Sequence, residues 1–250
     1  MIFPGVWLMQ VAGKRPLASS RLANPIRTWV RWFAPGAIWR NLCQECIVDF
    51  QSNPSNAGTK QLESQEFKMR RTSLTHPLQI ATISAGPDFG RVGITFCPGK
   101  YDPDAVSGFW DRDLSIDLDA IRVWGAAAVV TLVHQHELCL LRVEQLGEEV
   151  TGRDMLWFHL PIVDVSIPDE KFEQQWAVAG DTLRNLLRSG CDVLVHCRGG
   201  LGRAGTIGAR LLIELGMEPE AAIGQVRAAR PGAIETPEQK QYVQGIARLA

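Results

Sequence analysis

Hydrophobic and polar residues follow a regular pattern only from about residue 78 onward. The runs Ala128–Val133 (AVVTLV) and Val193–Val195 are apolar apart from one threonine, which is typical of strands buried on both faces of a sheet. Ile94–Phe96 and Trp157–Leu160 predict two more short strands. Six blocks have helical spacing, and they cover about 117–126, 136–147, 168–189, 204–215, 219–229 and 237–248.

Strands that alternate with helices predict a single layered α/β domain, with a central, mostly parallel sheet flanked by helices. We place this domain at residues 74–250. The composition is ordinary for a globular protein, since 46% of the residues are hydrophobic and 21% are charged. The apolar runs are too short to span a membrane. Six cysteines in 250 residues favour a reduced, cytoplasmic protein over a disulfide scaffold.

Residues 1–73 differ from the rest of the chain. They hold 10 Lys and Arg against 4 Asp and Glu, a net charge of +6, whereas the remainder carries −7. Three interpretations stand: a basic module that touches an acidic partner or a membrane surface, a disordered tail, or a stretch outside the native protein if translation starts at Met69. We favour the last two, because no fold-specifying pattern precedes Met69. Cys43 and Cys46 form a lone CxxC pair, which is too few ligands for zinc.

The segment Val193–Thr206 (VLVHCRGGLGRAGT) carries the candidate chemistry. A buried strand ends at its His-Cys pair, five residues separate the cysteine from an arginine, and a helix follows. Ligands of α/β sheets bind where strands end, and a helix N-terminus offers free N–H groups to an anion. Glycines let several backbone N–H groups converge on one anion. The sequence predicts a phosphate loop, whose binding residues are Arg198, Gly199, Gly200, Leu201, Gly202 and Arg203.

Cys197 lies at the base of this phosphate loop. A helix N-terminus and nearby cations stabilise a thiolate, so we expect Cys197 to be ionised at neutral pH and to attack phosphorus. The planar fork of Arg203 fits two phosphate oxygens at once. The expected product is a phosphocysteine, which water then hydrolyses. This scheme needs no cofactor and no metal ion.

The loop and two other segments resemble a known family. HCRGGLGR, residues 196–203, is similar to the HCxxGxxR signature of the cysteine-dependent tyrosine and dual-specificity phosphatases, and especially to the cyclin-dependent-kinase-associated type and its bacterial relatives. The resemblance runs from about Ile94 to Tyr242. It also rests on His159–Asp164 (HLPIVD) and Gly232–Gln239 (GAIETPEQ). It implies a phosphotyrosine-phosphatase-like fold, with a general-acid loop at the first segment and a water-positioning glutamine at the second.

A carboxylic acid is needed to protonate the leaving oxygen. The resemblance favours Asp164 for this role and gives the water-positioning role to Gln239. Asp169 is the alternative acid, although an aspartate in the first turn of a helix is also explained by the helix dipole. We expect His196 to order the phosphate loop rather than to act as a base.

Ala204 departs from the family, in which a Ser or Thr at this position steadies the departing thiolate. We therefore expect slow hydrolysis of the phosphocysteine, unless Thr206 or water substitutes. His134, His136 and Glu137 look like a metal-binding group, but no further ligand is in register. We interpret these three side chains as solvated.

The leading functional hypothesis is a phosphatase of phosphotyrosine, and also of phosphoserine or phosphothreonine, in proteins. The alternatives are a phosphatase of a small phosphomonoester, such as an inositol phosphate or a nucleotide, and a slow or non-catalytic phosphate-binding module. A net charge of −1 provides no positive field for nucleic acid or an anionic membrane. We therefore expect neither as a partner.

Overall fold

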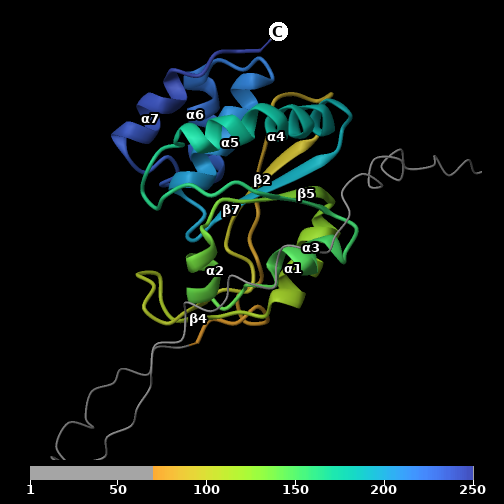
Figure 1. The fold of residues 1–250 in the computed structure, drawn as a ribbon, viewed down its shortest axis with the longest axis vertical. Helices are drawn as coiled ribbons and strands as arrows, with labels where there is room; N and C mark the ends of the chain where they lie inside the picture. Colours follow the sequence, from red (N-terminus) through yellow and green to blue (C-terminus); the bar gives the residue numbers. More distant parts are fainter. Residues whose placement is uncertain (1–69, 250) are drawn as a thin grey trace, which may run out of the picture. The chain divides into compact units, whose positions relative to one another are not determined.

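A five-stranded sheet forms the centre of the computed structural model, which describes residues 70–249 (Figure 1). Residues 1–69, with Cys43, Cys46 and the start at Met69, lie outside the described residues. The strand order is β1-β2-β7-β5-β6, with β1 antiparallel to β2 and the other pairs parallel. The strands are β1 (Ala81–Ser84), β2 (Arg91–Phe96), β5 (Ala126–Thr131), β6 (Leu156–His159) and β7 (Asp192–Cys197), and β3 (Tyr101–Asp102) pairs separately with β4 (Trp110–Asp111).

Helices cover both faces of the main sheet. In Figure 1 the helices α4 to α7 lie on one side of it and α1 to α3 on the other. Because both faces are covered, the inner strands β2, β5 and β7 are largely buried, and Val193–Val195 of β7 is fully inaccessible to solvent. The predicted fold class is confirmed. The helices are α1 (Leu114–Trp124), α2 (Gln135–Leu140), α3 (Leu146–Thr151), α4 (Glu170–Arg188), α5 (Gly202–Glu214), α6 (Pro219–Ala229) and α7 (Pro237–Gln244).

The single helix predicted over residues 136–147 is wrong. The chain forms two short helices, α2 and α3, with a turn between them. Arg142 takes a left-handed backbone conformation (φ 58°), and the N–H of Val143 donates to the Leu138 carbonyl at 2.9 Å. Leu141, Val143 and Leu146 are all buried. Their spacing imitates a helix, although the turn is what points them into the core.

Four other elements differ from the sequence prediction, since the two-residue strands β3 and β4 were not predicted. Helix α4 begins two residues later than predicted, and Pro168 precedes its N-cap. Strand β1 was not predicted, because it is a short edge strand in which Ile83 is the one buried side chain. A strand with so little buried surface carries almost no alternation in its sequence. The remaining predicted strands and helices differ from the observed bounds by a few residues.

Helix α5 follows the phosphate loop and is buried along its whole length. Ion pairs hold it against α4: Arg210 contacts Glu173 at 2.7 Å, and Arg184 contacts Glu214. Removing one partner of a buried ion pair costs about 3–5 kcal/mol. Helix α5 is therefore a rigid support for the residues at its N-terminus.

Candidate active site

Strand β7 ends at Cys197, and this residue is only 3% exposed. The backbone N–H of Gly200 donates to the Cys197 sulfur at 3.2 Å. Helix α5 starts at Gly202 with Leu201 as its N-cap, and no side chain caps its free N–H groups. These N–H groups remain available to an anion. The phosphate loop thus joins the end of a buried strand to the start of a buried helix, as the sequence predicted.

Two glycines of the loop are required by close packing. Gly200 has a φ of +72°, and a Cβ there would lie 2.5 Å from the Phe96 backbone nitrogen of β2. At Gly202, a Cβ would lie 2.3 Å from the Glu235 carboxylate and 2.9 Å from the Gln239 amide. A side chain at either position would push the loop away from its neighbours. The glycines therefore fix where the loop lies as well as how it curls.

Arg203 is buried, and two carboxylates from neighbouring segments bind its guanidinium. Its Nη1 and Nη2 donate to the two oxygens of Glu137 at 2.8 and 2.9 Å, and Nη1 also donates to the Ile162 carbonyl at 3.0 Å. Nη2 lies 2.7 Å from an Asp164 oxygen. Burial lowers the pKa of Arg203, but the Glu137 hydrogen bonds and the charges of Cys197, Glu137 and Asp164 outweigh it and raise the pKa. The guanidinium stays charged next to the Cys197 sulfur.

The expectation that Glu137 is a solvated side chain is wrong. Its residue is 6% exposed, and burial raises the pKa of its carboxyl, but the hydrogen bonds from Arg203 and from the His134 backbone outweigh burial and lower it. His136 is exposed, as expected. The sequence places Glu137 in the first turn of α2, and only the packing of α2 against the phosphate loop brings it to Arg203.

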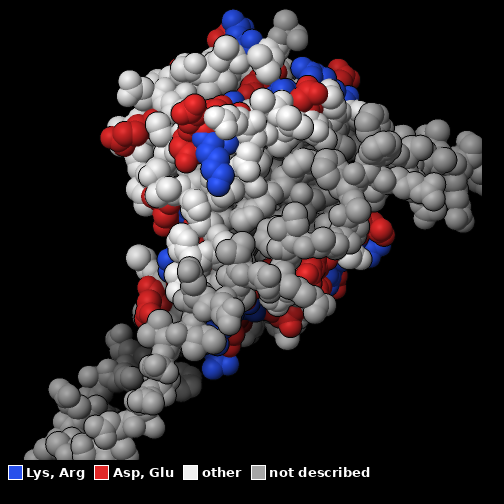
Figure 2. All heavy atoms as spheres, viewed as in Figure 1, with Lys and Arg blue, Asp and Glu red and all other residues white. Residues whose placement is uncertain are grey.

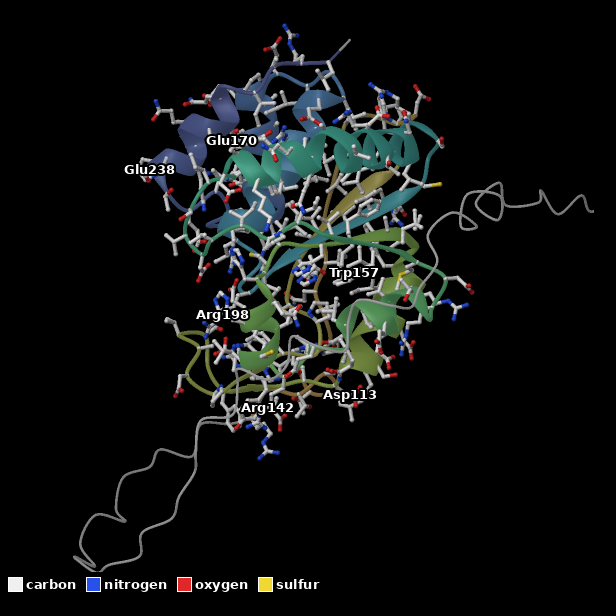
Figure 3. The ribbon with its side chains drawn as sticks, viewed as in Figure 1. Asp113, Arg142, Trp157, Glu170, Arg198 and Glu238 are labelled. Carbon is white, nitrogen blue, oxygen red and sulfur yellow. The ribbon has the colours of Figure 1, made fainter. Side chains whose placement is uncertain are left out.

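Arg198 contributes to the loop differently from the prediction. Its guanidinium donates to both oxygens of Asp102, at 3.2 and 3.0 Å. Lys100, which is buried, donates to the Arg198 carbonyl at 3.5 Å and lies 3.7 Å from Asp102. In Figure 3 the Arg198 side chain lies beside α2. The side chain of Arg198 is thus paired with Asp102 outside the loop, and its predicted role in phosphate binding stays a prediction.

Asp164 lies in an exposed turn after β6. Its side chain is 55% exposed, and the N–H of Ser166 closes the turn by donating to the Val163 carbonyl at 3.1 Å. Val165 within the turn has a φ of 60°, a left-handed conformation that costs a β-branched residue about 1–3 kcal/mol. We call residues 163–168 the acid loop. Asp169, the alternative acid, is the N-cap of α4 and accepts from the Phe172 N–H at 2.8 Å.

Gln239 is fully buried in α7 and connects two segments of the site. Its Oε1 accepts from the Glu235 N–H at 3.0 Å, and its Nε2 donates to the Ser166 carbonyl in the acid loop at 3.2 Å. The structure therefore brings the Gly232–Gln239 segment against both the acid loop and the start of α5. The water-positioning role that the resemblance gives to Gln239 stays a prediction.

Ala204 and Thr206 both lie in the first turns of α5 and are fully buried. The Thr206 hydroxyl donates to the Gly202 carbonyl at 2.9 Å, which is a bond within its own helix. Its proton is therefore already bonded, which favours water over Thr206 as the substitute for the hydroxyl that Ala204 lacks.

His196 precedes the cysteine and is fully buried. Its Nε2 lies 2.8 Å from the Thr131 hydroxyl, which also accepts from the Trp157 indole N–H at 2.9 Å. Burial lowers the pKa of His196 to about 3. The imidazole is neutral at physiological pH, and its contacts link β7 to β5 and β6. Its role in ordering the phosphate loop stays a prediction.

The neutral His196 predicts acid destabilisation. In the unfolded chain a histidine binds a proton below a pKa of about 6.5, whereas folded His196 binds one only near its pKa of about 3. Its contribution to stability is complete above pH 6.5 and is lost progressively as the pH falls to 3. We expect His196→Asn to flatten this loss by about 1–2 kcal/mol between pH 6.5 and 5, measured by urea unfolding. Equal slopes for both proteins would contradict the prediction.

The described residues contain neither a metal-binding cluster nor a membrane-spanning helix. Within residues 70–249, no group of three or more His, Cys, Asp or Glu side chains is arranged to hold a metal ion. No helix among those residues is both long enough and apolar enough to cross a membrane.

A profile of the family described as "Swiss Army Knife protein, DSP-PTPase phosphatase domain" matches residues 118–243. Human cyclin-dependent kinase inhibitor 3 is 30% identical over 199 residues, which cover 76% of this chain and 88% of the human protein. The chain belongs to the cysteine-dependent tyrosine and dual-specificity phosphatases. The family resemblance drawn from the sequence is confirmed.

Other relatives agree with this assignment. Rat cyclin-dependent kinase inhibitor 3 is 30% identical over 135 residues, but the match spans only 62% of the rat protein and 53% of this chain. A crystal structure of kinase associated phosphatase, with its catalytic-site cysteine replaced by serine, is 27% identical with a TM-score of 0.59, covering 67% of this chain and 92% of that one. Tk-PTP in its active form is 29% identical with a TM-score of 0.50, covering 66% and 95%.

Sequence reasoning missed several residues of the site. The sequence predicts a solvated Glu137 and gives no indication of Asp102 or Lys100. It also gives no indication of Arg230, whose side chain reaches the phosphate loop. These residues lie on separate elements with ordinary local patterns, so no signal in the sequence connects them to Cys197.

Proposed function

We propose that this phosphatase removes phosphate from phosphotyrosine, and from phosphoserine or phosphothreonine, in proteins through a phosphocysteine at Cys197. One observation supports this most directly. The Cys197 sulfur accepts the Gly200 N–H at 3.2 Å, at the uncapped start of α5, and the charge of the buried Arg203 acts on it. A thiolate in such surroundings is stabilised and nucleophilic.

In the first proposed step, the Cys197 thiolate attacks phosphorus and the bond to the leaving oxygen breaks. Glu137 occupies the Nη1–Nη2 edge of Arg203, which leaves the edge formed by Nε and Nη2 for two phosphate oxygens. Asp164 now contacts Nη2. An arriving phosphate replaces it there and releases the Asp164 carboxylate. The carboxylate takes up a proton from solvent in the first turnover, and from the hydrolytic water in later ones, and the resulting carboxylic acid donates this proton to the leaving oxygen.

In the second proposed step, water attacks the phosphorus of the phosphocysteine. Asp164 accepts the proton of that water, the bond between sulfur and phosphorus breaks, and the thiolate is restored. Gln239, which binds the acid loop through the Ser166 carbonyl, keeps the Asp164 loop and the water site together. The reaction consumes one water and releases inorganic phosphate.

The surface next to the acid loop favours a protein substrate over a polyanionic small molecule. Ile167 of that loop borders a hollow that Glu170, Glu173 and Glu238 also line. Red acidic side chains gather at the upper left of Figure 2, where Figure 3 labels Glu170 and Glu238. Negative charge here opposes an inositol polyphosphate or a nucleotide. A reactive thiolate persists in a reducing compartment, so we also propose the cytoplasm as the location.

A substrate panel tests the proposal. Initial rates are measured on phosphotyrosine and phosphothreonine peptides, inositol phosphates and nucleotides at equal concentration. We expect the peptides to be hydrolysed fastest, with kcat/KM at least about tenfold above the small molecules. Faster hydrolysis of an inositol phosphate or a nucleotide would favour the small-molecule alternative. Tight phosphopeptide binding without any phosphate release would favour a binding module.

The buried Ala204 predicts that breakdown of the phosphocysteine limits turnover. With para-nitrophenyl phosphate we expect a burst of nitrophenol followed by a slow steady state. Ala204→Ser supplies a hydroxyl that donates to the departing thiolate, and a hydrogen bond to a charged group is worth about 1.5–3 kcal/mol. We expect steady-state turnover to rise by roughly tenfold or more, with a smaller burst in rapid-mixing experiments.

Thr206→Val is the control for this prediction, because the Thr206 hydroxyl bonds within its helix. It should keep both the burst and the slow steady state. A wild-type protein without a burst, or a Thr206→Val variant with a much slower second step, would refute this account of Ala204.

A further inference from the structure

Arg230 reaches the phosphate loop from the end of α6. It is the C-cap residue of that helix, far along the chain from Cys197. Its Nη2 donates to the Gly199 carbonyl at 3.2 Å, and its Nε donates to the Gly200 carbonyl at 3.1 Å. One guanidinium therefore holds two successive carbonyl groups of the loop.

Because Arg230 holds two loop carbonyls, it also sets the direction of the N–H groups in the same peptides. The C=O and N–H of a planar trans peptide point in opposite directions. The peptide between Gly199 and Gly200 donates its N–H to the Cys197 sulfur at 3.2 Å, while its C=O accepts from Arg230. The next peptide has its C=O held by Arg230, which directs the N–H of Leu201 the opposite way. Arg230 thus turns both N–H groups toward the sulfur side of the loop.

Arg230 differs from the other two arginines at the loop. Arg203 is paired with Glu137 and Arg198 with Asp102. For Arg230, the hydrogen bonds found within residues 70–249 go to the two glycine carbonyls. Burial lowers the pKa of Arg230, and the charge of Cys197 opposes that effect. Its positive charge therefore polarises the loop peptides and acts on the sulfur without a carboxylate to offset it.

The opposite side of the loop is fixed by contact with β2. Gly200 packs so closely on Thr95 and Phe96 that a Cβ would lie 2.5 Å from their backbone atoms. The loop is held between this strand end and the Arg230 guanidinium. Without Arg230, the strand still limits the position of the loop, and within residues 70–249 the hydrogen bond from the Gly200 N–H to the Cys197 sulfur is what remains to orient these two peptides.

We infer that Arg230 is a positioning residue that orients the Gly200 and Leu201 N–H groups toward the sulfur and the bound oxyanion, and that it stabilises the Cys197 thiolate through them. The inference rests on the proposed function, because the role of Arg230 is to keep the phosphate loop in the conformation that binds phosphate. Arg230 itself acts through the peptides and does not contact the reacting atoms.

The test uses Arg230→Met, which keeps much of the side-chain length but removes the donors and the charge. Arg227→Met is the matched control, because Arg227 belongs to the same helix and donates to the Ala233 and Ile234 carbonyls at 3.1 and 3.0 Å. Both variants are made in the full chain. Circular dichroism melts check that each still unfolds cooperatively.

Two measurements that need no turnover follow. The first is the rate at which iodoacetate alkylates Cys197, taken as the ratio between pH 6 and pH 9. Cys97, Lys100 and Arg203 also act on the Cys197 charge, and both variants leave them in place. We expect Arg230→Met to lower this ratio by at least about threefold, because one nearby opposite charge is lost. The second is tungstate affinity by calorimetry, which we expect to weaken by about tenfold.

Arg227→Met should leave the alkylation ratio within about twofold of wild type. An unchanged ratio and tungstate affinity in Arg230→Met, or equal changes in both variants, would overturn the inference. If Arg230→Met does not unfold cooperatively, Arg230→Lys replaces it and should show a smaller loss in the same direction, whereas no loss would again overturn the inference. A wild-type protein that binds tungstate but hydrolyses no phosphomonoester would contradict the proposed function and leave the role of Arg230 measurable.

Discussion

Cys197→Ser is expected to lower the turnover of para-nitrophenyl phosphate by at least about 10⁴-fold, since removal of an enzyme nucleophile typically costs about that much or more. A serine hydroxyl is not ionised at neutral pH, and the oxygen is a poorer leaving group than sulfur if a phosphoserine forms. The Gly200 N–H and the Arg203 guanidinium remain in place. The variant should therefore still bind tungstate, with an affinity within about tenfold of wild type. Steady-state kinetics and calorimetry measure the two quantities.

Cys191→Ser is the matched control for this prediction. Cys191 is a partly buried free cysteine just before β7, and it makes the same sulfur-to-oxygen change on the same segment of chain. Its turnover should stay within about twofold of wild type. If Cys197→Ser retains more than about one hundredth of wild-type turnover, or if Cys191→Ser loses as much, then Cys197 is not the nucleophile.

Asp164→Ala is expected to lower kcat on a phenyl phosphate by about 10²–10³-fold, which is the usual contribution of a general acid. The loss should be much smaller on para-nitrophenyl phosphate, because nitrophenolate leaves readily without a proton. KM should change little or fall, since the Asp164 carboxylate occupies Arg203 in the absence of substrate. The alkaline side of the pH profile for kcat/KM, where a general acid loses its proton, should become shallower. Kinetics on the two substrates across pH 5 to 8 measure these effects.

Asp169→Ala separates this role from the alternative acid. Asp169 accepts the Phe172 N–H as the N-cap of α4, so its replacement should cost about 1 kcal/mol of stability and leave the leaving-group dependence of kcat unchanged. The opposite pattern, with the large kcat loss in Asp169→Ala and little change in Asp164→Ala, would transfer the general-acid role to Asp169.

The elements with the most buried surface were the easiest to predict. The strands β5 and β7 are continuous apolar runs because both faces of a parallel sheet are covered, and α6 begins at its first-turn proline, Pro219, as predicted. The prediction failed where local and tertiary preferences compete. In residues 136–147 the hydrophobic spacing matched a helix, but a turn at Arg142 satisfies the same burial with two shorter helices.

The residues of the candidate site likewise fall into those that local sequence encodes and those that tertiary packing brings together. Cys197 and Arg203 stand in one segment, so the strand, loop and helix that join them are encoded locally. Glu137, Arg230 and Asp102 come from three other elements, and their partners are specified by packing over long sequence distances. A carboxylate in the first turn of a helix is normally solvated, which is why Glu137 gave no distinguishing signal.

The sequence alone therefore determined the fold class and the strand, loop and helix around Cys197, and it predicts the nucleophile and the phosphate-binding arginine, because each depends on residues that are neighbours in the chain. Only the tertiary structure decided how that arginine is oriented by Glu137, that the Thr206 hydroxyl is already bonded, and that Arg230 holds the loop carbonyls. The physical reason is that hydrogen bonds and ion pairs are short-ranged and directional, so their partners are chosen by how helices pack on the sheet. Hydrophobic periodicity indicates which face of a helix or strand is buried, but it does not indicate which polar group of the neighbouring element that face will contact.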